Sequence, residues 1–136
     1  MAEQAASIRF TNPSTLATPP GYTHVAEITR GRIVYISGQI ALDQAGNIVG
    51  AGDFHAQARQ VFENLKAALA AVGADFTHVV KLNIYLRDMA NLLLLREVRD
   101  QYVNTQQPPA STAVEVSRLA QDAFLLEVEA VASLPE

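Results

Sequence analysis

The sequence predicts a two-layer α+β fold, in which two helices cover one face of a mixed β-sheet. Segments 53–72 and about 89–103 repeat apolar residues every three or four positions, which is typical of amphipathic helices. Six shorter segments, several of them rich in β-branched residues, complete the order strand, strand, strand, helix, strand, helix, strand, strand. The length of 136 residues suits one domain, which we expect to span residues 1–136.

Three strands are expected before the first helix. Residues 7–10 form a candidate edge strand, and an irregular stretch with several prolines follows it. Residues 24–29 and 32–37 have the alternation and the β-branched residues of strands. Arg30 and Gly31 lie between these two strands, so a hairpin is predicted there.

The first helix has clear signals at both ends. Asp53 is the expected N-cap, and Gly73 is expected to end the helix. The second helix should end before the prolines at 108 and 109, which cannot continue it. The remaining expected strands are 79–86, 112–116 and 124–132. Apolar residues on both faces of such a small sheet predict an association surface, and therefore an oligomer.

The composition excludes several classes of protein. There is no cysteine, which rules out disulfides, thiolate catalysis and cysteine-bound metals. The net charge of −4 disfavours a nucleic-acid-binding protein. No apolar stretch approaches the length of a membrane span, and no signal peptide is recognisable, so a cytoplasmic location is expected. His24, His55 and His78 are isolated, and no phosphate-binding glycine motif occurs, so neither a metal nor a cofactor is expected.

Two polar features remain as candidate site residues. Glu127 and Glu129 should share one face of the last strand, because side chains alternate with a period of two. They form the solvated face of an edge strand, or one of them is a carboxylate that lines a subunit cleft, where it could move protons. Ser37 and Gly38 follow a strand and form either a simple turn or part of a site.

Several short motifs occur in order along the chain. They are Gly21-Tyr22, Ile36-Ser37-Gly38-Gln39, and the segments 57–65, 80–81 with 86–89, 109–116 and 125–132. Together they resemble the RidA family, also called the YjgF/YER057c/UK114 family. The first is similar to the Gly-Pro-Tyr segment of the family, without the proline, and the second resembles its strand-end Ser-Gly-Gln element. The resemblance covers residues 21–132.

The resemblance implies a fold like that of chorismate mutase, with a six-stranded mixed sheet packed on two helices. It also implies a homotrimer with clefts between its subunits and a small-molecule ligand. The activity implied is hydrolysis of enamines and imines to carbonyl compounds and ammonia, without a cofactor. Glu127 would orient the water and move the proton, while Tyr22 and Ser37 would shape the cleft. Gly38 and Ala113 would offer backbone donors, and Thr112 would lie in a loop beside the cleft.

The sequence departs from the family pattern at two positions. Ser111 stands where active family deaminases have an arginine that binds the substrate carboxylate. A hydroxyl cannot replace a bidentate guanidinium, so this change implies either lost activity or a changed substrate. Arg96 stands where many members have asparagine, and it is either a relocated cation for an anionic ligand or a solvated helix residue.

The leading interpretation is therefore an imine or enamine deaminase with an altered substrate preference. The alternative is a trimeric ligand-binding protein without catalytic activity, which Ser111 favours. A ribonuclease or translation inhibitor, the other activity associated with the family, is disfavoured by the negative net charge.

Overall fold

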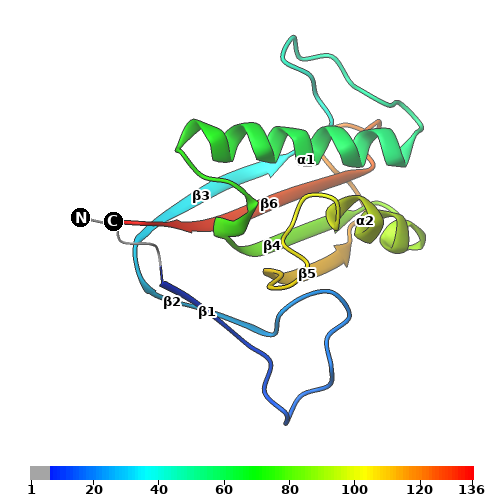
Figure 1. The fold of residues 1–136 in the computed structure, drawn as a ribbon. Helices are drawn as coiled ribbons and strands as arrows, with labels where there is room; N and C mark the ends of the chain where they lie inside the picture. Colours follow the sequence, from blue (N-terminus) through cyan, green and yellow to red (C-terminus); the bar gives the residue numbers. More distant parts are fainter. Residues whose placement is uncertain (1–6) are drawn as a thin grey trace.

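The computed structural model describes residues 7–136 and forms two layers, helices on one side and strands on the other (Figure 1). The elements follow the predicted order, and within the described residues two short 3₁₀ helices, η1 and η2, precede β4 and α2. Their bounds are β1 (Ser7–Thr11), β2 (Val25–Arg30), β3 (Arg32–Gln39), α1 (Phe54–Ala71), η1 (Phe76–His78), β4 (Val79–Leu86), η2 (Met89–Asn91), α2 (Leu92–Arg99), β5 (Ala110–Glu115) and β6 (Leu126–Leu134).

The six strands form two sheets. A four-stranded sheet has the order β3-β6-β4-β5, while β1 and β2 pair only with each other. The larger sheet is mixed, because β4 and β5 are parallel and its other pairs are antiparallel. Figure 1 shows the β1–β2 pair projecting away from the larger sheet. The six predicted strands are present, but their hydrogen bonds do not join them into one continuous sheet within the chain.

The predicted hairpin between β2 and β3 is wrong. Only Gly31 separates the two strands, and a hairpin connection needs about two residues. With a φ of 120°, Gly31 instead bends the chain from one sheet to the other. β2 then pairs with β1, placing Ile8 opposite Ile28, and β3 pairs with β6.

Strand β6 lies in the centre of the larger sheet, between β3 and β4. Ala130 of β6 is opposite Ile36 on one side and Leu82 on the other. The interpretation of Glu127 and Glu129 as the solvated face of an edge strand is therefore wrong, since their strand has a partner on each side.

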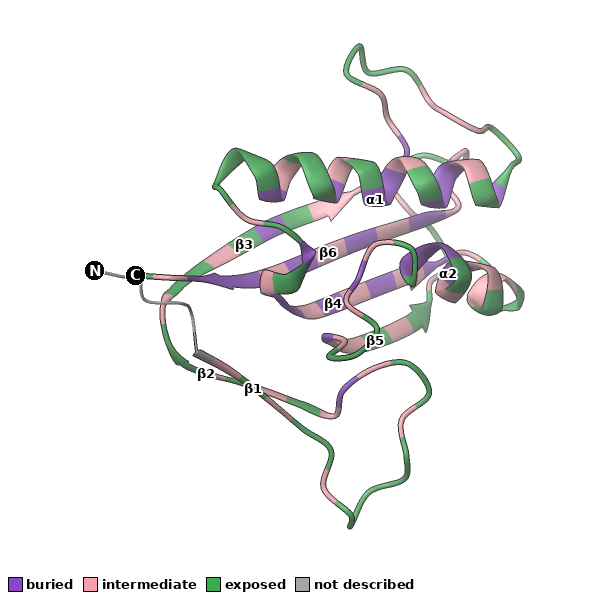
Figure 2. Ribbon diagram, in the orientation of Figure 1, coloured by how far each residue is buried: buried purple, intermediate pink, exposed green. Residues whose placement is uncertain are grey.

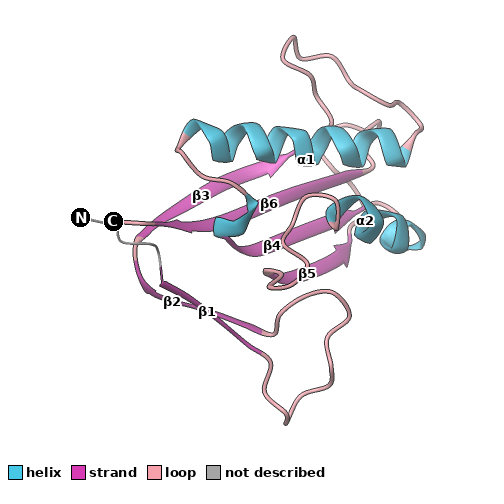
Figure 3. Cartoon of the chain, in the orientation of Figure 1, coloured by secondary structure: helices cyan, strands magenta, loops and turns pink. Residues whose placement is uncertain are grey.

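The hydrophobic core lies between the helices and one face of the four-stranded sheet (Figure 3). The buried stripe of α1, visible in Figure 2, includes Val61, Phe62, Leu65 and Leu69. The burial pattern of β6 alternates, with Leu126, Val128 and Ala130 turned toward the core, so its glutamates lie on the other face.

That other face carries exposed apolar side chains. Tyr35 is 78% exposed, Ile33 51% and Val114 40%. Val114 lies in register with Tyr85 of β4, which is itself in register with Glu127 of β6. We call this helix-free side of the four-stranded sheet the open face. The predicted apolar residues on a second sheet face are therefore present.

The ends of α1 match their sequence signals. The Asp53 carboxylate accepts a hydrogen bond from the Ala56 amide at 3.1 Å, as an N-cap does. Gly73, with a φ of 77°, ends the helix: its amide donates to Ala70, and the Ala74 amide donates to Leu69. These two bonds form a Schellman motif.

The second helix is shorter than predicted. It covers Leu92–Arg99 rather than reaching residue 103, and the 3₁₀ turn η2 precedes it. After Arg99 the amides of Gln101 and Tyr102 donate three residues back instead of four, which tightens and ends the helix. Its inner face is apolar: Leu95 and Val98 are fully buried, and Leu94 and Tyr102 pack partly buried against the core.

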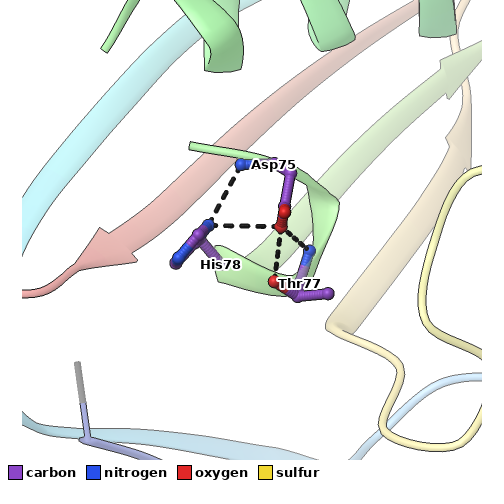
Figure 4. A network of polar contacts seen from close by, with 3 residues as sticks. All are labelled: Asp75, Thr77 and His78. Atoms are coloured by element: carbon purple, nitrogen blue, oxygen red, sulfur yellow. Dashed lines mark hydrogen bonds and ion pairs between the residues drawn. The ribbon is translucent and has the colours of Figure 1, made fainter. Parts of the chain in front are cut away.

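A polar cap positions the start of β4 (Figure 4). The Asp75 carboxylate accepts from both the amide and the hydroxyl of Thr77, and the Asp75 amide donates to His78 Nδ1 at 3.0 Å. The hydrogen bond from the Thr77 hydroxyl holds the pKa of Asp75 below its ordinary value. His78 thus has a structural partner.

Within residues 7–136, no helix combines the length and the hydropathy that a membrane span requires.

Candidate functional site

A pocket of about 270 Å³ lies between α2 and β5 and contains five of the predicted site residues. These are Tyr22, Arg96, Ser111, Thr112 and Ala113. The rest of its lining is formed by four residues, Ile84, Leu92, Leu95 and Arg99. We call it the α2–β5 pocket. Its size is suited to a small molecule.

Strand register and loop contacts bring these residues together. Ser111 and Ala113 are in register with the buried residues Leu82 and Ile84, so they face the helices. Tyr22 arrives from the segment that precedes β2. The neighbouring Thr23 holds that segment in place, since its amide donates to Pro109 O at 3.2 Å and its hydroxyl to Pro108 O at 2.5 Å.

Arg99 is the member of the pocket that the sequence reasoning missed. It is only 4% exposed, and its Nε donates to Asp100 Oδ1 at 3.0 Å. A Cβ placed on Gly21 would lie 2.7 Å from Arg99 Nη2, so the absence of a side chain at Gly21 makes room for the guanidinium. The helical spacing contained the signal, because Arg99 follows Leu92 by seven residues and Leu95 by four, on the buried face.

The pocket is electropositive. Arg96 and Arg99 both line it, and no aspartate or glutamate does so among the described residues. Arginine stays charged at any physiological pH. Two guanidinium groups beside an uncharged lining favour an anionic ligand.

A second group of predicted residues lies on the open face. The Tyr85 hydroxyl donates to Glu129 Oε1 at 2.6 Å, and this hydrogen bond raises the pKa of Tyr85. The negative charges of Glu129 and Glu127 raise the same pKa further. Both carboxylates therefore lie close to Tyr85, on the side of the sheet that the helices leave open.

Gly38 lies directly beneath Glu127. The pairing of β3 with β6 is irregular between Ile36 and Gln39, which is the position of a β-bulge. A Cβ on Gly38 would lie 1.9 Å from Glu127 Oε2, so the glutamate side chain packs on the bare backbone. Ser37, beside it, lines a groove of about 400 Å³ on this face together with Asn83 and Glu129.

Within one chain, the predicted site residues thus form two groups on opposite faces of the sheet. Tyr22, Arg96, Ser111, Thr112 and Ala113 line the α2–β5 pocket, whereas Ser37, Gly38 and Glu127 lie on the open face. The Thr112 side chain itself also turns to the open face, where its hydroxyl accepts from Lys81 Nζ at 2.7 Å. The side chain of Ser111 faces the helices, and that of Glu127 faces away from them.

Two polar residues of α1 hold the strands that present the second group. Gln57 is fully buried, and its amide donates to Gly50 O and Ala123 O while accepting from the Leu125 amide. Asn64 donates to Ile40 O at 3.0 Å and Leu42 O at 2.9 Å. These bonds fix the chain after β3 and before β6. Gln57 and Asn64 belong to the motif in residues 57–65, and the structure gives that motif a scaffolding role.

No group of three or more His, Asp or Glu side chains in the described part of the chain is arranged to hold a metal ion. The polar groups of the site are carboxylates, guanidinium groups, hydroxyls and backbone amides. Such a set binds small polar ligands and can move protons.

The fold and the site therefore define a two-layer α+β protein with a small cationic pocket between α2 and β5. Comparison with known proteins identifies the family. A family model described as "Endoribonuclease L-PSP" matches residues 14–134, nearly the whole chain. The chain belongs to this family, which is the RidA or YjgF/YER057c/UK114 family.

Two relatives and two solved structures illustrate the similarity. Protein DfrA of Myxococcus xanthus is 41% identical over 111 residues, which cover 82% of this chain and 83% of that one. The human 2-iminobutanoate/2-iminopropanoate deaminase is 36% identical over 101 residues, covering 74% and 72%. The Rid-family protein YyfB of Yersinia pestis superposes with a TM-score of 0.81 at 34% identity, covering 93% of this chain and 98% of that one. RidA of a Psychrobacter species superposes with a TM-score of 0.70 at 34% identity, covering 87% and 92%.

Proposed function

We propose that this protein hydrolyses a reactive imine or enamine to a carbonyl compound and ammonia. The observation that carries the proposal is the placement of Glu127, whose carboxylate packs against the bare backbone of Gly38 beside Ser37. The human relative named 2-iminobutanoate/2-iminopropanoate deaminase supports this reaction class.

The reaction needs one water and one proton carrier. Water attacks the electrophilic imine carbon, forming a C–O bond while the C=N electrons move to nitrogen. Glu127 accepts a proton from the water and delivers it to the nitrogen. Glu127 then takes the hydroxyl proton of the tetrahedral species and passes it to the amine nitrogen, so that the C–N bond breaks as the C=O bond forms and ammonia leaves. Overall, one water is consumed and the oxidation state of the carbon does not change, so no oxidant is required.

The proposal includes assembly as a homotrimer with the site between subunits. A single chain keeps Glu127 and the α2–β5 pocket on opposite faces of its sheet. A neighbouring copy that covers the open face would bring the residues of its own α2–β5 pocket next to Glu127. The exposed Tyr35 and Ile33 give that face the apolar surface that an interface requires.

We further propose that the substrate preference differs from that of the usual family deaminases. The sequence resemblance puts Ser111 at the position of the family arginine, and here Ser111 faces the α2–β5 pocket. A hydroxyl forms weaker bonds with a carboxylate than a guanidinium does. The preferred substrate is therefore held by other groups of the pocket.

Imine hydrolysis by the purified protein tests the reaction. An amino-acid oxidase generates imines in situ, semicarbazide traps what remains, and carboxylated and neutral imines are compared. We expect acceleration on at least one imine and a fall of roughly 100- to 10,000-fold in Glu127→Gln, the range of general acid–base catalysis. Glu97→Gln, at an exposed position of α2, is the matched control and should retain full activity.

Two results would overturn the reaction. If no imine is hydrolysed faster, the protein is instead a ligand-binding member of the family. If RNA is cleaved by nuclease-free protein and Glu127→Gln abolishes the cleavage, the activity is that of a ribonuclease.

Sedimentation equilibrium and subunit mixing test the assembly. We expect three times the mass of the chain, and a smaller species for Tyr35→Glu, which places a charge on the open face. Glu127→Gln damages one side of the shared site, and Ala113→Phe fills the pocket on the other side. Mixed oligomers of the two variants contain some sites with both sides intact, so they should recover part of the activity. A monomer with full activity would contradict the shared site.

A further inference from the structure

We propose that Arg99 binds the anionic group of the ligand, with the Ser111 hydroxyl beside it, so that the ligand of the α2–β5 pocket is a small carboxylate. Only the reaction of the ligand rests on the proposed function. The binding of an anion at Arg99 stands on the geometry of the pocket itself.

The first observation is a buried cation whose hydrogen-bonding capacity is only partly used. Arg99 is only 4% exposed. Of its three guanidinium nitrogens, Nε is the one with a partner among the described residues, Asp100. Within residues 7–136, neither Nη1 nor Nη2 donates to a carbonyl, hydroxyl or carboxylate. A guanidinium has five N–H donors, so most of those of Arg99 have no acceptor among the described residues.

Burial makes that state unfavourable unless an anion joins it. A charge withdrawn from water is costly without a paired and hydrogen-bonded partner. The partner that Arg99 has, Asp100, keeps a side chain that is 46% exposed and touches only the Nε side. A carboxylate entering the pocket would meet the free Nη edge and form charge-assisted bonds there.

Arg99 lines the pocket, and its surroundings leave space around the guanidinium. Gly21 lies against Nη2 with a φ of 82° and contributes no side chain there. Arg96 adds a second positive charge to the lining, and Ser111 adds a hydroxyl on the same side of the sheet. Leu92, Leu95 and Ile84 close the rest with apolar surface, which leaves room for a short aliphatic chain.

The distribution of charge selects the chemical class. The described lining contains no acidic residue, so a cationic ligand would find no partner there. The pocket of about 270 Å³ is small, which favours a short-chain acid over a nucleotide. A short imine that carries an anionic group meets both conditions, with that group at Arg99 and its imine carbon free to face a catalytic group.

The test compares Arg99→Gln with wild type on paired substrates, a carboxylated imine and its neutral methyl-ester counterpart. We expect kcat/KM on the carboxylated imine to fall roughly 10- to 150-fold, the effect of losing one charge-assisted hydrogen bond. The neutral imine should change less than 3-fold. Arg118→Gln, at an exposed arginine outside the pocket, is the control and should change neither value. Equal losses on both imines would assign Arg99 a structural role and overturn the proposal.

A binding measurement separates this inference from the proposed reaction and from failure to fold. Titration calorimetry of wild type and of Arg99→Gln with 2-oxobutanoate, and with its uncharged analogue butanone, needs no turnover. Binding of the acid but not of the ketone supports the anion site even if no imine is hydrolysed. Equal binding of both, or binding of the acid undiminished in a folded Arg99→Gln protein, would overturn it.

Discussion

The carboxylate of Glu127 occupies the space that a side chain on Gly38 would need, since a Cβ there would lie 1.9 Å from Glu127 Oε2. Gly38 does not have a positive φ, so its backbone is one that other residues could adopt. What requires glycine at this position is the glutamate above it. The β-bulge between β3 and β6 and the proposed proton carrier are thus one structural unit.

Gly38→Ala should destabilise the protein by about 1–3 kcal/mol, because the added methyl group overlaps the Glu127 side chain. Urea denaturation measures the change in the free energy of unfolding. In a Glu127→Ala background, where the overlapping atoms are absent, the same substitution should cost less than half as much. Equal costs in both backgrounds would show that Gly38 is required for another reason.

Gln57→Ala should destabilise the protein by roughly 2–4 kcal/mol, since it leaves buried polar groups of three segments without partners. Its amide joins α1 to Gly50, Ala123 and Leu125. Thermal and urea denaturation measure the loss. Gln101→Ala, at an exposed glutamine, is the control and should change stability by less than about 0.5 kcal/mol. A similar small change in both variants would remove Gln57 from its scaffolding role.

Burial, followed by the hydrogen bond to Glu63, raises the pKa of Tyr102 to about 12 from an ordinary value of 10.0. A raised pKa means that folding favours the neutral phenol. The stability it contributes is complete below pH 10 and is lost as the pH rises toward 12. Absorbance at tyrosinate wavelengths should therefore show a late titration step, which Tyr102→Phe removes. If that variant keeps the late step unchanged, another tyrosine carries it, and Tyr85 would be the first to examine because its pKa is also raised.

Ser111→Arg should restore activity on carboxylated imines to the Arg99→Gln protein. The two positions line the same pocket, so the substitution returns a guanidinium to it from the β5 side. We expect recovery of at least about 10-fold in kcat/KM, corresponding to one charge-assisted hydrogen bond. Ser111→Lys is the comparison variant, because it supplies the charge without the bidentate geometry, and it should recover less. No recovery with either residue would show that the anion is bound elsewhere.

The sequence predicted the helices and the inner strands well because their signals are local. Asp53 and Gly73 mark the ends of α1 by backbone chemistry that acts within a few residues. The alternation of Leu82 and Ile84 is likewise a property of β4 alone. The partner of β2 was predicted wrongly because strand pairing depends on distant residues. Gly31 resembles a hairpin-turn residue in the sequence, but in the structure it bends the chain from one sheet to the other.

Part of the candidate site could also be predicted. Motif resemblance selected Ser111 and Tyr22, which the structure brings into one pocket. It did not select Arg99, whose importance depends on burial and on the missing side chain of Gly21, 78 positions earlier in the sequence. Nor could periodicity alone establish that Glu127 lies on a central strand, since that follows from the pairing of β6 with both β3 and β4.

The central position of β6 also governs the order in which the protein can fold. In the larger sheet β3 and β4 are not neighbours and are joined through β6, which follows the other described strands in the sequence. Until β6 inserts, α1 has no continuous surface to cover, and loop-closure entropy must be overcome before the distant pairing of Ile36 with Ala130 contributes any stability. Folding is therefore a late and non-local event, and its rate should be sensitive to substitutions in β6.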